Sequence, residues 1–151
     1  MRIKRYMKSK QSLPLRGNKI FVDTSFFKGL IDQEDGFHEQ SLDILKKLQS
    51  ESYELISSNY ILDETYTLLR TRCDLDTAID FHDGLGSGLL KLTLLRVEVD
   101  DEINAWELFK EPWSKLSFTD CTSFAIMKRT GLKEVATFDD HFSRAGFTIF
   151  K

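Results

Sequence analysis

The chain has 151 residues, of which 41% are hydrophobic and 30% are charged, a composition typical of one globular domain with a real core. No apolar run approaches the roughly 18 residues that a membrane-spanning helix needs, and the basic N-terminus lacks the apolar stretch of a signal peptide. We therefore expect a cytoplasmic protein without a membrane segment. Cys73 and Cys121 are widely separated and have no CxxC partner, which favours reduced thiols over a zinc site.

The net charge of −3 is unevenly distributed along the chain. Residues 1–22 contain seven basic side chains and no acid, which gives +7, and the remaining residues carry −10. Residues 1–18 show no hydrophobic periodicity, so we expect a flexible basic arm followed by one folded domain over 19–151. An acidic domain is a poor general binder of phosphate, because nucleic-acid affinity normally comes from basic surfaces.

The first half of the domain alternates between strand-like and helix-like patterns. Residues 19–22 predict a strand that ends at Asp23, and Thr24 can cap a helix that runs to about residue 30. Apolar residues at helical spacing predict further helices over 36–51 and 59–72, and residues 53–57 predict a strand between them.

The second half continues the same alternation. Asp74 or Asp76 can cap a helix that the glycine-rich segment 84–88 ends, and residues 92–97 predict a strand. Helices follow over 100–113 and 117–130, then a strand over 134–138, a short helix over 139–145 and a last strand over 147–150. Strands separated by helices predict a three-layer α/β/α fold with a mostly parallel central sheet of four to five strands.

Two acids directly follow predicted strands. Asp23 comes after the first strand and Asp139 after the fourth. In open parallel sheets, ligands bind beyond the carboxyl ends of the strands, so both acids are expected at the same end of the molecule.

Two more acids lie on predicted helices that face the core. On the helix 59–72, Glu64 lies at the edge of the apolar face, whereas its neighbour Asp63 points to solvent. Asp120 begins a helix that is apolar nearly all round, on one stripe with Phe124 and Met127, so its carboxylate is expected to face the protein.

Each acid has a simpler explanation when it is taken alone. Asp23 can cap a helix, Asp120 can form a capping box with Ser117, Asp139 can stabilise a helix N-terminus, and Glu64 can be a half-exposed helix residue. Four acids that converge on one crevice, however, repel one another unless cations neutralise them. A cluster of carboxylate oxygens suits Mg²⁺ or Mn²⁺, and such a site can activate water to attack a phosphodiester.

Four segments together resemble a known family. IFVDTSFF (20–27), ILDETYTLL (61–69), LSFTDCTSFAIM (116–127) and VATFDDHFSRAGF (135–147) resemble, in order and spacing, the acidic motifs of PIN-domain ribonucleases. Within that family the chain is most similar to the VapC-type toxins of prokaryotic toxin–antitoxin pairs. The resemblance covers residues 19–150, which is everything except the arm.

The resemblance implies roles for particular residues. The family's catalytic acids fall on Asp23, Glu64, Asp120 and Asp139, and its small hydroxyl residues, which orient the carboxylates, fall on Thr24, Ser25 and Thr119. It also implies a Mg²⁺- or Mn²⁺-dependent endoribonuclease in which Asp23, Asp120 and Glu64 hold the metal and Asp139 completes the cluster. The implied partners are an RNA substrate, a cognate antitoxin and a second copy of the chain in a homodimer.

Two features depart from the family pattern. Asp140 follows Asp139 where a basic or variable residue is commoner, which raises the question whether Asp140 shares the site. The basic arm is also an addition, and it is open whether it binds RNA.

Three alternatives to a toxin are open. One is a PIN nuclease of RNA processing or turnover, against which the lack of an appended RNA-binding domain argues. Another is a catalytically inactive PIN fold that serves as a binding module, although all four acids are present. The third is a phosphorelay receiver domain, but only one acid follows the first strand here and the third strand leads to Val97 and Glu98 without the receiver's arrangement.

Overall fold

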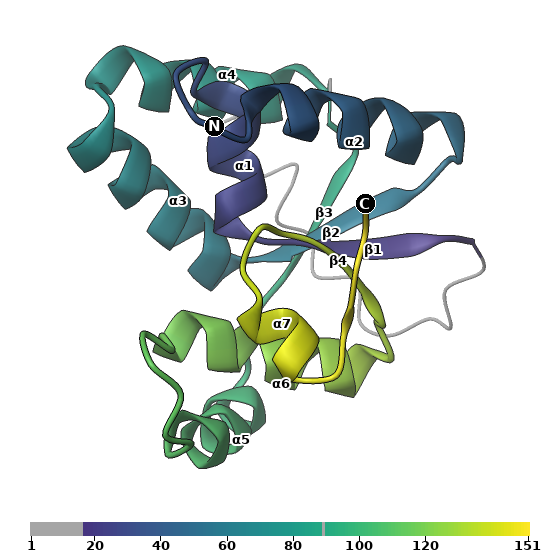
Figure 1. Ribbon diagram of the computed structural model, residues 1–151, viewed down its shortest axis with the longest axis vertical. Coiled ribbons are helices and arrows are strands. Elements are labelled where there is room, and N and C mark those ends of the chain that lie inside the picture. The colour runs from purple at the N-terminus through teal and green to yellow at the C-terminus, as the bar shows by residue number, and fades with distance from the viewer. Residues whose placement is uncertain (1–16, 89) are drawn as a thin grey trace.

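A computed structural model describes residues 17–88 and 90–151, which form five strands and seven helices (Figure 1). The strands form one fully parallel sheet in the order β3-β2-β1-β4-β5. Helices α1 to α4 cover one face and α5 to α7 the other, so the fold is the expected three-layer α/β/α sandwich. The strands are β1 (Lys19–Val22), β2 (Glu54–Ser58), β3 (Leu92–Leu95), β4 (Glu134–Ala136) and β5 (Thr148–Ile149). The helices are α1 (Thr24–Ile31), α2 (His38–Ser50), α3 (Asn59–Arg72), α4 (Leu75–Ser87), α5 (Val99–Phe109), α6 (Phe118–Thr130) and α7 (His141–Arg144).

The centre of the sheet is apolar because both of its faces are covered by helices. Ile20, Phe21 and Val22 of β1 are all fully buried, as are Val135 and Ala136 of β4. A continuous apolar run, rather than an alternating one, is typical of a central parallel strand.

All twelve predicted elements are present, and they differ from the prediction mainly at their ends. The helix predicted to reach residue 113 ends at Phe109, since a residue before proline disfavours the helical conformation and Pro112 follows closely. The strand predicted over 134–138 ends at Ala136, and the helix predicted to start at Asp139 starts at His141. The four residues between them leave the sheet and form part of the candidate site.

The predicted arm lies almost entirely outside the described residues, which begin at residue 17. None of the helices in the described ranges is long and apolar enough to span a membrane. Cys73 and Cys121 are both free thiols.

The register of β1 and β4 determines where the site lies. Val22 pairs with Ala136, so the two neighbouring strands end at the same level. The backbone N–H of Asp23 then donates to the carbonyl of Ala136 at 3.1 Å. The chain therefore leaves the sheet at two adjacent points, one leading to Asp23 and the other to Asp139.

Candidate active site

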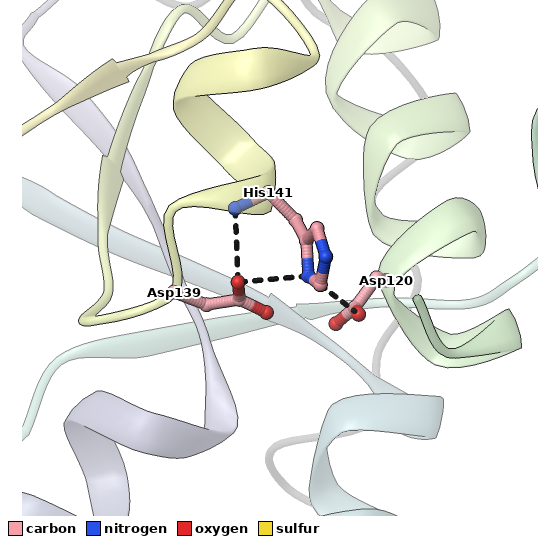
Figure 2. A group of neighbouring side chains, drawn as sticks. All are labelled: Asp120, Asp139 and His141. Atoms are coloured by element: carbon pink, nitrogen blue, oxygen red, sulfur yellow. Dashed lines mark hydrogen bonds and ion pairs between the residues drawn. The ribbon is translucent and has the colours of Figure 1, made fainter. Parts of the chain in front are cut away.

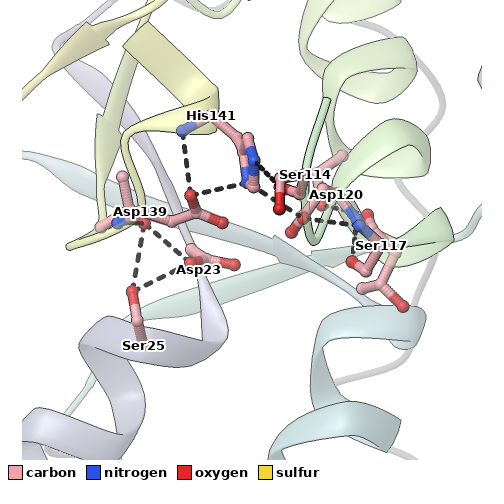
Figure 3. Close-up of polar contacts among 10 residues, drawn as sticks. Asp23, Ser25, Ser114, Ser117, Asp120, Asp139 and His141 are labelled. Atoms are coloured by element: carbon pink, nitrogen blue, oxygen red, sulfur yellow. Dashed lines mark hydrogen bonds and ion pairs between the residues drawn. The ribbon is translucent and has the colours of Figure 1, made fainter. Parts of the chain in front are cut away.

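The Asp23 carboxylate is held by hydroxyl groups rather than by the helix that follows it. Asp23 is the N-cap residue of α1, but its side chain makes no capping hydrogen bond. Instead its Oδ2 accepts a hydrogen bond from Ser25 Oγ at 3.0 Å (Figure 3). The same oxygen accepts a second hydrogen bond from Thr137 Oγ1 at 2.7 Å. The simple capping explanation for Asp23 is therefore wrong, and its carboxylate, which is only 4% exposed, is oriented by its neighbours.

Asp139 is placed by the turn between β4 and α7. Its backbone N–H donates to Thr137 Oγ1 at 3.0 Å, and its Oδ1 accepts from the backbone N–H of His141 at 2.9 Å. Thr137 thus contacts both acids: its hydroxyl donates to Asp23 and accepts from Asp139. This one buried side chain joins the ends of β1 and β4.

Asp120 caps the helix α6 and also belongs to the cluster of possible metal ligands. Ser117 Oγ accepts from the Asp120 backbone N–H, and Asp120 Oδ2 accepts from the Ser117 backbone N–H, both at 3.0 Å. The predicted capping box is therefore confirmed. The same carboxylate also faces Asp139 and His141 across the site (Figure 2), so the capping role and a place in the cluster are compatible.

Glu64 enters the site from α3, as its helical position predicted. Its Oε2 accepts a hydrogen bond from Thr24 Oγ1 at 2.5 Å, and the Thr24 hydroxyl is approached in turn by Thr65 Oγ1 at 3.4 Å. Glu64 is half-buried, whereas Asp63 is exposed. The prediction that Glu64 turns inward at the edge of the apolar face while Asp63 points to solvent is therefore confirmed.

His141 completes the cluster. One ligand atom each from Asp120, Asp139 and His141 lies within 4.8 Å of the others. His141 Nδ1 is 2.9 Å from Asp139 Oδ1 and 3.8 Å from Asp120 Oδ2, and the ring's other nitrogen, Nε2, lies 2.9 Å from the carbonyl of Ser114 (Figures 2 and 3). A carbonyl can only accept, so Nε2 carries a proton. Nδ1 is buried and has no hydrogen-bond partner among the described residues, although the Asp139 carboxylate lies 2.9 Å away.

The electrostatics of the site favour uncharged carboxyls when no cation is bound. Burial raises the pKa of Asp120 to about 7, and the nearby charges of Asp23 and Asp139 add to the effect. Burial also raises the pKa of Asp23, against the hydrogen bonds from Thr137 and Ser25, which lower it. Burial raises the pKa of Glu64, as do the charges of Asp23 and Asp139. Asp23, Glu64 and Asp120 are thus destabilised as anions, first by burial and then by neighbouring acids.

These residues fit a hard divalent cation. Carboxylate oxygens are the ligands that Mg²⁺ and Mn²⁺ prefer. Asp120 and Asp139 offer oxygens within 4.8 Å of each other, and Asp23 and Glu64 lie near enough to interact electrostatically with Asp139. The buried Nδ1 of His141 has no hydrogen-bond partner within the described ranges and lies beside the Asp139 and Asp120 carboxylates, and in the tautomer with the proton on Nε2 its lone pair can bind a metal. A cation would stabilise the charged forms of Asp23, Glu64 and Asp120, which burial and the neighbouring acids disfavour.

The structure brings together six of the seven residues expected at the site. Thr24 and Ser25 contact Glu64 and Asp23, as expected of residues that orient carboxylates. Thr119 does not: within the described ranges its side chain makes no hydrogen bond to an acid, and only its carbonyl accepts, from Thr122 and Ser123.

Two residues at the site were not expected from the sequence. The three histidines show no metal-ligand spacing, so the sequence favours a solvated or hydrogen-bonded His141, with a substrate contact as the less favoured alternative because His141 lies two residues after Asp139. Thr137 is not among the predicted site residues. Its place at the end of a strand, two positions before a candidate acid, does indicate a hydroxyl that could contact that acid. Asp140 is exposed and does not belong to the ligand cluster. It lines an adjoining groove instead.

Comparison with known proteins identifies the family. Residues 20–148 match the PIN domain family. The chain is 38% identical over 133 residues to the 23S rRNA-specific endonuclease VapC20 of two Mycobacterium tuberculosis strains, and the alignment covers 85% of this chain and 95% of the relative.

Solved structures show the same fold. The crystal structure of Mycobacterium tuberculosis VapC20, described as a sarcin–ricin loop cleaving toxin, matches with a TM-score of 0.72 at 34% identity and covers 85% of this chain and 96% of that chain. FitAcB from Neisseria gonorrhoeae matches with a TM-score of 0.60 at 20% identity, over 87% of this chain and 96% of that chain. At that identity the second likeness supports the fold alone.

Proposed function

This chain belongs to the PIN-domain family and is a homologue of the VapC-type toxins, and on that premise we propose that it is an endoribonuclease that cuts 23S rRNA in the sarcin–ricin loop. The observation that carries the proposal is the convergence of Asp23, Glu64, Asp120 and Asp139 at the carboxyl ends of β1 and β4. Similarity to a nuclease of that specificity supports the choice of RNA.

The proposed chemistry is hydrolysis of a phosphodiester bond by water. Asp23, Asp120 and Asp139 would hold the metal ion, Mg²⁺ or Mn²⁺, together with Glu64 or His141. Such an ion, when bound, lowers the pKa of a coordinated water and offsets the charge of the phosphate.

The chain's own residues supply orientation. Ser25 and Thr137 fix the Asp23 carboxylate through two hydrogen bonds, and Thr24 fixes Glu64. The capping box fixes Asp120 at the first turn of α6, which is otherwise almost wholly buried. Because each acid is held by a neighbour, the carboxylates need little rearrangement when substrate and cation bind.

The proposed partners are a cognate antitoxin and a second copy of the chain, in the cytoplasm. An apolar stripe on α5 supports the idea that another chain covers this helix: Val99, Ile103 and Trp106 are 71%, 59% and 55% exposed. Exposed apolar surface of this kind marks interaction sites on soluble domains.

The test is cleavage of a defined RNA. The purified full chain is incubated with ribosomes and with a synthetic sarcin–ricin stem-loop, in Mg²⁺ or Mn²⁺ or in excess EDTA, and the ends of the products are mapped. We expect one cut within the loop when the metal is present and none in EDTA. Full activity in EDTA, or cleavage only at other RNAs, would contradict the metal requirement or the proposed target respectively. The protein with Asp120→Asn controls for contaminating nuclease.

A further inference from the structure

An open groove adjoins the acidic cluster, with a volume of about 740 Å³. Its lining combines residues of the reaction centre with aromatic and basic side chains. Ser25, Asp139 and His141 belong to the centre, and Phe37, Phe138 and Arg144 line the groove with them. A molecule in this groove would therefore touch the catalytic acid Asp139 directly.

Two of the residues that line the groove form a stacked pair of aromatic rings. The rings of Phe37 and Phe138 are nearly parallel, at 7°, with centroids 4.2 Å apart. Phe138 packs on the buried Phe26 at 6.4 Å, whereas Phe37 is 47% exposed. Phe37 thus ends a stack that begins in the core, and its outer surface is available to another flat ring.

The stack is tied to the reaction centre by the backbone. The backbone N–H of Phe138 donates to Ser25 Oγ at 2.9 Å, and the same hydroxyl donates to Asp23. Asp139 is the next residue in the chain. The position of the rings relative to the acids is therefore fixed, as a subsite beside the cleaved bond requires.

Arg144 supplies a positive charge to an otherwise acidic groove. Its guanidinium lies 4.7 Å from the centre of the Trp113 ring, and Trp113 in turn lies parallel to the ring of His141. Within the described ranges Arg144 forms no ion pair, although the groove also contains Asp139 and Asp140. A cation held against an aromatic ring and lacking an acidic partner is suited to a phosphate.

We propose that this groove binds one unpaired nucleotide of the RNA next to the cleaved phosphodiester, with its base stacked on Phe37 and its phosphate at Arg144. The inference rests on the proposed function and extends it from chemistry to substrate positioning. Stacking on aromatic rings is how proteins hold unpaired bases, and it compensates for the weak electrostatic attraction of an acidic domain.

The first experiment measures binding apart from cleavage. All proteins carry Asp120→Asn so that the RNA stays intact, and the probe is the synthetic sarcin–ricin stem-loop with 2-aminopurine placed at one loop position at a time. We expect quenching at one position, and we expect Phe37→Ala to abolish that quenching and weaken binding roughly 5- to 100-fold, the range for loss of one base–aromatic stack. Phe37→Trp should retain both. Ile79→Ala, which removes a similarly exposed apolar side chain (45%) on α4, is the matched control and should bind as the parent does.

The second experiment removes the base instead of the ring. An abasic nucleotide at the quenched position should weaken binding to the parent by the same factor as Phe37→Ala, and the two changes together should weaken it no further. In active protein, Phe37→Ala should raise KM and leave kcat within about threefold, because the ring binds the ground and transition states alike.

The outcomes separate this inference from the proposed function. Two results would overturn the stacking subsite alone while the protein still cleaves the loop normally. One is that Phe37→Ala binds RNA as Ile79→Ala does, and the other is that the losses from removing the ring and removing the base add. Absence of both binding and cleavage by the unmodified protein would overturn the proposed function and this inference with it. Arg144→Gln should reduce the slope of log affinity against log salt by about 0.7, and Arg144→Lys should restore it. An unchanged slope would remove the phosphate contact.

Discussion

The four carboxylates of the cluster have different surroundings although they meet at one place. Asp23 is buried and bonded to two hydroxyls, Asp120 is part of a helix cap, Glu64 is half-buried against Thr24, and Asp139 lies on a turn. These differences predict which acids matter for function and how they affect stability.

Glu64 and Asp63 are neighbouring acids on α3, so substitutions of the two can be compared directly for their effect on cleavage. We expect Glu64→Gln, Asp23→Asn and Asp120→Asn each to lower cleavage at least roughly 100-fold, because each removes charge that would hold the cation and stabilise the phosphate in transit. Asp63→Asn, on the exposed side of the same helix, should remain within about twofold of the parent. Single-turnover cleavage rates on the stem-loop test this prediction. If Asp63→Asn lowered the rate as much as Glu64→Gln does, the assignment of Glu64 to the site would be wrong.

Asp120 also predicts how stability depends on pH when no metal is bound. Its pKa is about 7 in the folded protein and 3.8 as the ordinary value, so folding favours the neutral acid. The stability that Asp120 contributes is therefore complete below about pH 4 and is lost as the pH rises through 7.

Asp120→Asn should remove that loss, because Asn is neutral at every pH and its Oδ1 can still accept from Ser117. In EDTA we expect the variant to exceed the parent in free energy of unfolding, by about 2–3 kcal/mol more at pH 8 than at pH 5. Urea unfolding of both proteins at the two pH values measures this difference, with Asp63→Asn as the exposed control. If the difference in free energy of unfolding between the variant and the parent did not change with pH, the Asp120 carboxylate would not be destabilised by burial.

At the scale of the helices, the contact between α1 and α2 supports the aromatic wall of the groove. Gly29 of α1 faces Ser41 of α2 so closely that a Cβ on Gly29 would lie 2.2 Å from Ser41 Oγ and 3.4 Å from the Phe138 ring. Ser41 Oγ is itself buried, and no other residue in the described part of the chain forms a hydrogen bond with it. Two closely packed helices thus keep a glycine on one side and a short side chain on the other.

This contact predicts a pair of coupled substitutions. Gly29→Ala should destabilise the protein by about 1–3 kcal/mol through overpacking. Ser41→Ala should be neutral or stabilising, because it removes a buried hydroxyl that lacks a partner. With Ser41→Ala in place, Gly29→Ala should cost clearly less, since the nearest remaining atom of residue 41 is its Cβ at 3.3 Å. Thermal or urea unfolding of the four proteins completes the cycle, and additive effects would show that the two residues do not compete for the same space.

At the scale of the whole molecule, charge is divided between the first 22 residues, at +7, and the rest, at −10. An acidic domain that cuts RNA must gain affinity from local features, and the cation site and the aromatic groove are two of them. The basic segment is a third candidate on the grounds of its charge alone.

A protein that begins near Asn18 tests this segment. If its cations contact RNA, the shortened protein should bind more weakly at low salt and show a shallower dependence on salt, by about 0.7 in slope for each lost phosphate contact. Turnover of bound substrate should be unchanged, because the four acids lie after the truncation. We expect a modest effect, since Tyr6 is the only aromatic residue among the 17 that the truncation removes. Identical binding isotherms across a salt series would exclude a role in RNA recognition, whereas a loss of turnover would place the segment in the active site.

The sequence alone was sufficient for the order of elements, the parallel sheet and the family. Hydrophobic periodicity and turn residues are local signals, and they predicted all twelve elements to within a few residues. The position of Glu64 on the inner edge of its helix and the capping box at Ser117 were also predictable, because both depend on residues three or four apart. The four acids were found for the same reason: each is marked by its place relative to one strand or helix.

Only the tertiary structure decided what surrounds those acids. Thr137 bonds to Asp23, 114 residues away, because β1 and β4 are neighbours in register, and no local pattern contains that pairing. His141 faces Asp120 because a short turn after β4 brings α7 against the start of α6. Thr119 was expected to orient a carboxylate and instead turns its side chain elsewhere, since the direction of a side chain on the first turn of a helix depends on how the helix is docked. Spacing along the chain determines which residues share a face, but the contacts between faces arise only when the layers pack together.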